Sequence, residues 1–313
     1  MNQRLDSTTA LDQTSNEQYI VANNIRIAYD EFGDTTHPPL VLIMGLGTQM
    51  IAWADSFCQN IADHGFRVIR FDNRDVGLSD KIKVEYDVSI PKLLLRQRLR
   101  LSLKAPYTLH DMAKDTIGVL DALDIKAAHI VGASMGGMIS QLVAANFPER
   151  CLSLTSIMST TGNPALPAAD WRVSKQLISR PQSLNEEAIV AHGIKTWRII
   201  GSPDFPASDE ELRLKILRSF RRCSYPKGFR HQMAAIIKTG DRRELLNKIS
   251  APTLVIHGKQ DVLVPMQGGV DTANNIKGAR LKLIEGMGHD FPAQLQPRIA
   301  RMICKHIEER ASS

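Results

Sequence analysis

Short apolar runs, separated by polar loops and amphipathic segments, recur along most of the chain. The run Leu40–Met44 is continuously apolar and of strand length, which is typical of a strand buried on both faces of a parallel sheet. Similar patterns predict further strands at Ile25–Tyr29, Phe66–Phe71, Ala127–Val131, Cys151–Met158, Thr253–His257 and Arg280–Glu285. Helices are predicted between them, at Ile51–His64, Thr108–Leu123, Met266–Asn275 and Pro292–Glu309. This alternation predicts an α/β fold with a mostly parallel, doubly wound sheet.

The alternation of strands and helices breaks once, over residues 160–235. This stretch contains helical patterns and prolines but few strands. We therefore predict a helical cap at 160–235, inserted between the two blocks of the core at 19–159 and 236–313, over the carboxyl ends of the strands. A smaller insertion is predicted at 81–106, and residues 1–18 are expected to form a disordered tail.

The centre of the smaller insertion, Leu93–Leu101, is rich in leucine and basic residues. The favoured interpretation is an amphipathic helix packed on the body with its arginines in solvent. The alternatives are a lip of a substrate channel and a contact with a membrane surface.

Composition narrows the function classes. The chain has 313 residues, 43% of them hydrophobic, and a formal net charge of +6. Aromatic residues make up only 5%, and no zinc-finger or RNA-recognition motif is present, so nucleic acid is not expected as a partner. The four cysteines are widely spaced, which indicates reduced thiols in a cytoplasmic protein. No signal peptide or membrane-spanning run is recognisable, and a homodimer is left open.

The strongest chemical motif is Gly132-Ala-Ser134-Met-Gly136, between a predicted strand and a predicted helix. A strand that turns at once into a helix forces its serine into a sparsely allowed conformation. The flanking glycines keep the turn free of colliding side chains. Ser134 is therefore the candidate nucleophile.

A serine hydroxyl needs a base, and the base needs an acid that orients it. Among nine histidines, His289 lies on a glycine loop after a predicted strand end. Asp261 follows another strand end through a tight turn, whereas the adjacent Asp290 is expected to point away from His289. His129 and His257 are interpreted as structural. The order Ser134, Asp261, His289 is the one expected for an α/β-hydrolase arrangement.

An oxyanion formed at the serine needs two N–H donors. The backbone N–H of Met135, directly after the nucleophile, is one candidate. The backbone N–H of Leu46, in the loop after the strand Leu40–Met44, is the other, with a plain strand-end turn as the alternative. The substrate-binding residues are not predicted.

Two sets of charged residues could indicate a binding site, but a structural role is expected for each. Asp72, Asp75 and Asp80 lack His or Cys at ligand spacing, so a buttressing hydrogen-bond network is expected and no metal site is predicted. Basic residues in the second half of the cap are expected to face solvent, with a bias toward anionic substrates as the alternative. They are Arg218, Arg221, Arg222, Lys227 and Arg230.

Three segments resemble the α/β-hydrolase superfamily: residues 131–137 (VGASMGG), 257–261 (HGKQD) and 286–289 (GMGH). Residues 42–47 (LIMGLG), 71–79 (FDNRDVGLS) and 195–199 (KTWRI) are more similar to serine esterases of the aclacinomycin methylesterase type. The resemblance implies a capped carboxyl-ester hydrolase with Ser134, Asp261 and His289 in its triad. This chain differs from many members of the superfamily in having Met44-Gly45 where they have His-Gly.

The sequence therefore predicts a serine carboxylesterase that works without a cofactor, through an acyl-enzyme, on a small-molecule ester. Carbon–carbon bond hydrolysis, acyl transfer and cofactor-free perhydrolysis remain alternatives. A ligand-binding protein that keeps the fold without turnover is a further alternative.

Overall fold

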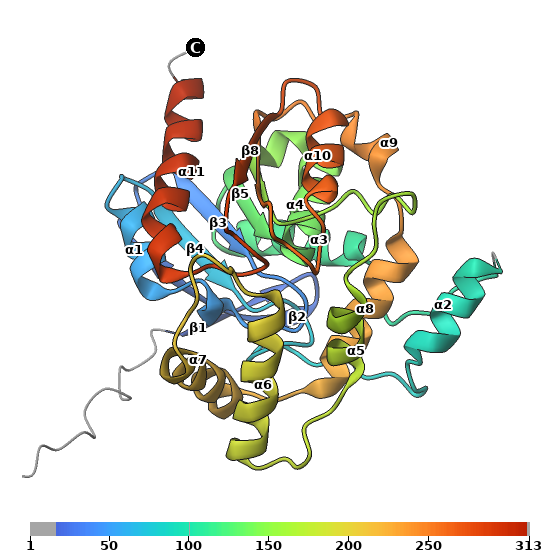
Figure 1. Cartoon of the computed structure of the whole chain (residues 1–313). Helices are drawn as coiled ribbons and strands as arrows, with labels where there is room; N and C mark the ends of the chain where they lie inside the picture. Colours follow the sequence, from blue (N-terminus) through green and yellow to red (C-terminus); the bar gives the residue numbers. More distant parts are fainter. Residues whose placement is uncertain (1–16, 100, 312–313) are drawn as a thin grey trace, which may run out of the picture.

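The computed structural model describes residues 17–99 and 101–311. Within these residues an eight-stranded sheet crosses the molecule in the order β1-β2-β4-β3-β5-β6-β7-β8 (Figure 1). The strands are β1 (Gln18–Ala22), β2 (Ile25–Phe32), β3 (Pro39–Ile43), β4 (Arg67–Phe71), β5 (Ala128–Ala133), β6 (Cys151–Ile157), β7 (Thr253–Gly258) and β8 (Arg280–Ile284). From β4 to β8 all neighbours are parallel, whereas β2 is antiparallel to both β1 and β4. The predicted mostly parallel sheet is confirmed.

Strand β1 was not expected, because residues 1–18 were assigned to a tail. Gln18 is already paired with Tyr29 of β2. Asn23 and Asn24, with φ of 47° and 63°, link the two strands as a two-residue hairpin. The predicted boundary of the tail at residue 18 is therefore wrong, and residues 1–16 lie outside the described residues.

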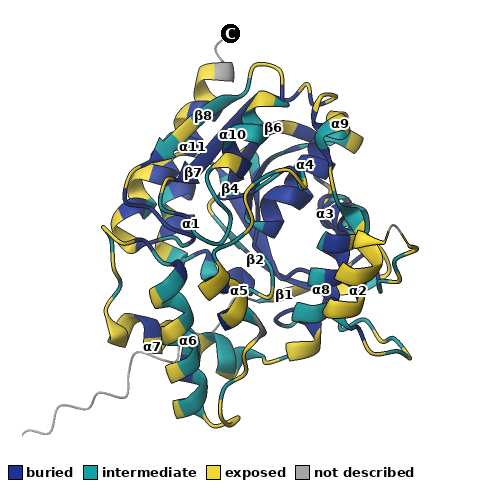
Figure 2. Ribbon diagram, turned by 45° about the vertical axis from the view of Figure 1, so that its right-hand side comes forward, coloured by how far each residue is buried: buried dark blue, intermediate teal, exposed yellow. Residues whose placement is uncertain are grey.

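Helices cover both faces of the sheet (Figures 1 and 2). Helices α3 (Leu109–Ala122) and α4 (Met135–Asn146) pack on one face, and α1 (Asp55–Ala62) and α11 (Gln296–Ala311) pack on the other. Helix α10 (Gln267–Asn274) contacts β7 and β8, and the short α9 (Arg243–Leu246) contacts α4. Short 3₁₀ turns lie at η1 (Met50–Ala52), η2 (Pro148–Arg150) and η3 (Ala293–Leu295). The pattern is a doubly wound α/β sandwich.

The strand β3 shows why its sequence is continuously apolar. Val41 and Ile43 belong to the core on the α3–α4 face, whereas Leu40 and Leu42 belong to the core on the α1–α11 face. All four side chains are fully buried. Alternate residues of a strand point to opposite faces, so only a strand covered on both sides needs every position to be apolar.

The four helices between β6 and α9 lie at one end of the sheet, below it in Figure 1. They are α5 (Trp171–Ile178), α6 (Glu186–Ile200), α7 (Asp209–Arg222) and α8 (Pro226–Thr239). We propose, as from the sequence, that they form a cap. The boundary predicted between residues 235 and 236 is wrong, because α8 continues through it to Thr239 and ends at the C-cap Gly240, where φ is +65°. Ala234 and Ala235 are fully buried, so the helix cannot be divided there.

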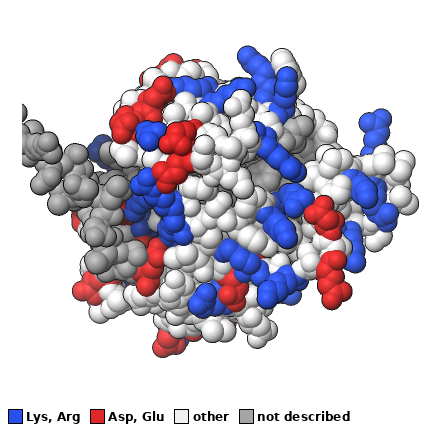
Figure 3. Space-filling view, turned by 90° about the horizontal axis from the view of Figure 1, so that it is seen from below, with Lys and Arg blue, Asp and Glu red and all other residues white. Residues whose placement is uncertain are grey.

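The insertion predicted at 81–106 contains helix α2 (Ile90–Arg98), which packs on α8. Leu93 is buried, whereas Leu94, Leu95, Leu99 and Leu101 are exposed. Arg96 and Arg98 lie in its last turn. In Figure 3 basic side chains gather on the right, the side on which α2 projects in Figure 1. The helix is amphipathic, as in the favoured interpretation, but it packs on α8 of the proposed cap and not on the body, and more of its apolar surface stays exposed than expected.

No helix within residues 17–99 and 101–311 combines the length and apolar character that a membrane crossing requires.

Candidate active site

Ser134 lies at the turn between β5 and α4, with φ of 56° and ψ of −119°. Such a conformation is strained for a residue with a Cβ, and it lifts the hydroxyl away from the sheet. A Cβ on Gly132 would lie 2.2 Å from the carbonyl oxygen of Gly136, and one on Gly136 would lie 2.0 Å from that of Ile43. The turn therefore exists only because both flanking positions are glycine.

Three strand ends bring the predicted triad together. The Nε2 atom of His289 lies 3.0 Å from Oγ of Ser134, and its Nδ1 lies 2.7 Å from Oδ2 of Asp261. Ser134 follows β5, Asp261 follows β7 and His289 follows β8. In this arrangement Nδ1–H donates to the carboxylate, which leaves Nε2 to accept the serine proton.

Asp261 is buried, and both of its carboxylate oxygens accept hydrogen bonds. Its Oδ1 accepts hydrogen bonds from the backbone N–H groups of Leu263 (3.0 Å) and Val264 (2.8 Å). Burial raises the pKa of this carboxyl, but the neighbouring His289 and the hydrogen bonds from His257 and His289 outweigh it and hold the pKa at about 2. Asp261 is therefore ionised at neutral pH.

His257 supports Asp261, a role that the sequence interpretation missed. Its Nε2 lies 2.8 Å from the carbonyl oxygen of Val264 and 3.4 Å from Oδ2 of Asp261. Both neighbours accept hydrogen bonds, so Nε2 carries the hydrogen and the ring is held as a donor. The spacing of four residues between His257 and Asp261, across the end of β7, is the sequence feature that could have indicated this contact.

The proposed cap contacts the loop of His289 through the last residue of α6 and the residues that follow it. The backbone N–H of His289 donates to the carbonyl of Ile200 (2.7 Å), and that of Gly288 donates to Oγ of Ser202 (2.9 Å). The carboxylate of Asp290 accepts hydrogen bonds from the backbone N–H and the hydroxyl of Ser202. Asp290 is thus turned away from the ring of His289, as expected, and joins the cap to the body.

The two predicted oxyanion donors lie on either side of the serine. Met135 is the first residue of α4, so its N–H has no acceptor within the helix. In the loop after β3, the N–H of Gly47 donates to Gln232 (2.7 Å) and that of Thr48 donates to the carbonyl of Gly45 (3.2 Å). Among the described residues the N–H of Leu46 has no hydrogen-bond acceptor, so we keep it as the proposed second donor. A Cβ on Gly45 would lie 3.1 Å from Cβ of Ser134, so this loop closely approaches the nucleophile.

The three aspartates after β4 are each held by hydrogen bonds, but to different partners. Asp72 accepts from the N–H groups of Met50 and Leu78, both at 2.8 Å, and forms an ion pair with Arg222. Asp75 and Asp80 have separate partners, namely His231 and the Ile82 N–H for Asp75, and the Arg26 N–H for Asp80. Among the residues that the structure describes, no three His, Cys, Asp or Glu side chains gather as metal ligands.

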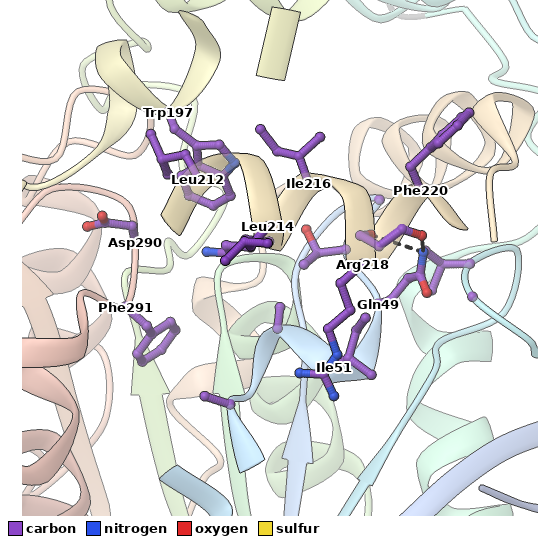
Figure 4. A pocket seen from close by; sticks show the side chains of 18 of the residues that line it. Gln49, Ile51, Trp197, Leu212, Leu214, Ile216, Arg218, Phe220, Asp290 and Phe291 are labelled. Atoms are coloured by element: carbon purple, nitrogen blue, oxygen red, sulfur yellow. Dashed lines mark hydrogen bonds between the residues drawn. The ribbon is translucent and has the colours of Figure 1, made fainter. Parts of the chain in front are cut away.

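A cavity of about 1010 Å³ lies between α7 and the body (Figure 4). It reaches Gly47 and Asp290, the sequence neighbours of Leu46 and His289. Its apolar lining comes from α6, α7 and the loops after β3 and β8, including Ile51, Trp197, Leu212, Ile216, Phe220 and Phe291. Ser134, Asp261 and His289 do not themselves line the cavity, which approaches the triad only through Gly47 and Asp290.

Comparison with known protein families shows to which family the chain belongs. The model of the alpha/beta hydrolase fold family matches residues 38–293, which is most of the chain. The chain belongs to the alpha/beta hydrolase family. The resemblance stated from the sequence and the predicted fold class are confirmed.

Individual alpha/beta hydrolases are similar over nearly their whole length. Rhodomycin D methylesterase DauP of Streptomyces sp. (strain C5) is 29% identical over 92% of this chain and 96% of its own. A 2-hydroxy-6-oxononadienedioate/2-hydroxy-6-oxononatrienedioate hydrolase of Burkholderia vietnamiensis is 28% identical over 90% and 91%. The solved meta-cleavage product hydrolase of Pseudomonas fluorescens IP01 has a TM-score of 0.73 at 20% identity, covering 94% of this chain and 98% of its own. The prediction of a carboxylic-ester hydrolase agrees with the first of these relatives.

Proposed function

We propose that this protein is a serine carboxylesterase with Ser134 as nucleophile, His289 as base and Asp261 as its orienting acid. The observation that carries the proposal is the continuous chain of contacts from Ser134 through His289 to Asp261, at 3.0 and 2.7 Å. The similarity to a methylesterase over 92% of the chain supports an ester as substrate.

In the first half-reaction, Nε2 of His289 takes the proton of the Ser134 hydroxyl while Oγ attacks the ester carbonyl carbon. The ionised Asp261 stabilises the imidazolium that results. The N–H groups of Leu46 and Met135 hold the oxyanion of the tetrahedral intermediate. His289 then gives its proton to the departing alcohol, and an acyl-enzyme remains.

In the second half-reaction, His289 takes a proton from water, whose oxygen attacks the acyl carbon. The same two N–H groups hold the second oxyanion, and His289 returns the proton to Oγ of Ser134 as the acid departs. No other reactant is needed, because the proton taken in each half-reaction is returned within it.

The test is hydrolysis of p-nitrophenyl esters from acetyl to decanoyl by the wild type and by Ser134→Ala. We expect turnover that depends on chain length and that the substitution abolishes. Absence of turnover on every ester contradicts the esterase, and activity that survives in Ser134→Ala contradicts the assignment of the nucleophile.

A second candidate is hydrolysis of a carbon–carbon bond, favoured by the similarity to the hydrolase from Burkholderia vietnamiensis. It is distinguished by assaying 2-hydroxy-6-oxononadienedioate beside the esters. Turnover of the oxo acid with esters left intact would favour this candidate. A cytoplasmic location, a homodimer and the absence of a cofactor stay predictions.

A further inference from the structure

The cavity between α7 and the body is lined by six charged side chains, and five of them already have partners. Four of the six are acidic and two are basic, and they are Asp55, Asp75, Glu211, Lys215, Arg218 and Asp290. The charged group that remains without a partner is the one whose hydrogen-bond donors or acceptors a ligand can use.

The acidic groups and Arg218 are accounted for. Their partners are Arg70 and Arg218 for Asp55, His231 and the Ile82 N–H for Asp75, Ser208 for Glu211, and Ser202 for Asp290. Glu211 closes the capping box at the start of α7. Arg218 lies 3.2 Å from the carboxylate of Asp55. None of these groups is available without breaking an existing contact.

Lys215 differs from the other five. Its Nζ lies 3.9 Å from the ring centroid of Trp197, and within residues 17–99 and 101–311 this exposed side chain makes no hydrogen bond or ion pair. It lies one turn before Arg218 on α7, and both side chains line the cavity. An ammonium group held against an aromatic face in a cavity retains its three donors for a ligand.

We propose that Lys215 binds an anionic group of the substrate, a carboxylate carried on the ester molecule away from the scissile bond. This inference rests on the proposed esterase function and names its substrate class. Trp197 contacts the ammonium from one side, and the apolar lining contributed by Leu212 and Phe291 would receive the hydrocarbon between the carboxylate and the ester.

The electrostatics of the cavity agree with this assignment. The Lys215 side chain is exposed, so its ammonium is hydrated when the cavity is empty, and a bound carboxylate would exchange that water for an ion pair. Asp290 does not lie within ion-pair distance of Lys215 in the described residues, and burial raises the pKa of Asp290.

The main competing ligand is a cation bound by Asp290. Its carboxylate already accepts two hydrogen bonds from Ser202, and the Lys215 charge repels a second cation from the same cavity. A neutral substrate is the other competitor. The test therefore compares anionic, neutral and cationic esters of matched length.

The substrates form two series, since the ester can enter in either orientation. The first contains monomethyl suberate, dimethyl suberate and the methyl ester of 8-aminooctanoic acid, which place the varied group on the acyl side. The second contains 6-acetoxyhexanoate, hexyl acetate and 6-aminohexyl acetate, which place it on the alcohol side. The readout is the ratio of kcat/KM for the anionic and neutral members of each series.

The variants are Lys215→Met, Lys215→Arg and, as a matched control, Arg213→Met. Arg213 is an exposed residue of α7 that does not line the cavity, so its loss removes one positive charge from the same helix. We expect the wild type to prefer the anionic ester in at least one series. Lys215→Met should lower that ratio by about ten-fold or more, chiefly through KM, because a hydrogen-bonded charge is lost. Lys215→Arg should restore most of the ratio, and Arg213→Met should leave it unchanged.

Three outcomes would overturn the inference: no preference for the anionic ester in either series, preference for the cationic ester, or an equal loss of preference in Arg213→Met. Each leaves the esterase intact as long as neutral esters are turned over and Ser134→Ala abolishes that turnover. Loss of all ester hydrolysis in the wild type would instead contradict the proposed function itself.

Discussion

The sheet edge that carries the triad and the cavity under α7 are held together by different kinds of contact. At the sheet edge, backbone fixes the geometry: Gly136 packs against the carbonyl of Ile43, and His289 is held by the carbonyl of Ile200. Around the cavity, side chains join cap to body, as where Gln49 donates to the carbonyls of Ser219 and Cys223 at 2.7 and 2.8 Å. Side-chain contacts can be exchanged one at a time, whereas backbone contacts cannot. We infer that the chemistry is fixed at the sheet edge and that specificity is set around the cavity.

The largest expected effect is on catalysis, from His289→Ala. Without the base, kcat for p-nitrophenyl butyrate should fall by about 10⁴-fold or more. Initial rates measure the loss, and His64→Ala, an exposed histidine bonded to the carbonyl of Asn60, is the control. A rate within ten-fold of the wild type would mean that another group removes the serine proton.

Next in size is the stability cost of adding one methyl group at the sheet edge. Gly136→Ala should destabilise the protein by about 4 kcal/mol or prevent folding, because the new Cβ would lie 2.0 Å from the carbonyl oxygen of Ile43. Urea unfolding followed by circular dichroism measures the free energy of unfolding.

The matched substitution in the cap is Gly193→Ala on α6. Its Cβ would lie 2.6 Å from Cδ1 of Ile216, the mobile end of a side chain. The gain in helix propensity offsets the crowding, so we expect a change within about 1 kcal/mol. Similar costs at Gly136 and Gly193 would contradict the distinction between the two regions.

Ion pairs between cap and body should differ according to burial. Arg222 and Asp72 form a pair whose side chains are 11% and 0% exposed, and Arg222→Gln leaves a buried carboxylate without its cation. We expect a loss of about 3 kcal/mol. Arg218→Gln, which breaks the exposed pair with Asp55, should change stability by less than about 1 kcal/mol. Thermal or urea unfolding of both variants decides between this ranking and the reverse.

A smaller effect is expected from the titration of Asp261. Its pKa of about 2 in the folded protein lies below the value of about 3.9 for an unfolded chain. The ionised carboxyl therefore stabilises the fold above about pH 4, and this contribution is lost as the pH falls from about 4 toward 2. The expected size is on the order of 2 kcal/mol. We expect the difference in unfolding free energy between wild type and Asp261→Asn to shrink over this interval, whereas a constant difference would show that the shift is absent.

Local patterns in the sequence were enough to predict most strands and helices of the α/β body. The apolar run of β3 follows from burial on both faces, and Thr108 with Asp111 forms the capping box that begins α3. The contact of Ser134, His289 and Asp261 was expected because the ends of parallel strands meet at one edge. Strand β1 was missed although Asn23-Asn24 is a hairpin signal, because an edge strand of mixed composition resembles a tail.

Contacts between distant segments could not be predicted. The ring of His257 reaches Asp261 because a turn folds back at the end of β7, and Gln232 of α8 reaches the loop of Leu46 from 185 residues away along the chain. Arg218 and Arg221 are exposed, as expected for a solvated face, although each also pairs with a carboxylate. The pairing of Arg222, whose side chain is 11% exposed, with the buried Asp72 was not foreseen. Only the folded structure shows that Lys215 is left out of these pairs.

The most direct test of the account is labelling with a p-nitrophenyl phosphonate, which leaves a stable analogue of the tetrahedral intermediate on an activated serine. We predict one equivalent of p-nitrophenol released per chain, loss of esterase activity, and a single adduct on the peptide that contains Ser134. The same reagent should leave Ser134→Ala and His289→Ala unlabelled. An active enzyme that takes up no label, or an adduct on another residue, would contradict the assignment of Ser134 as the nucleophile.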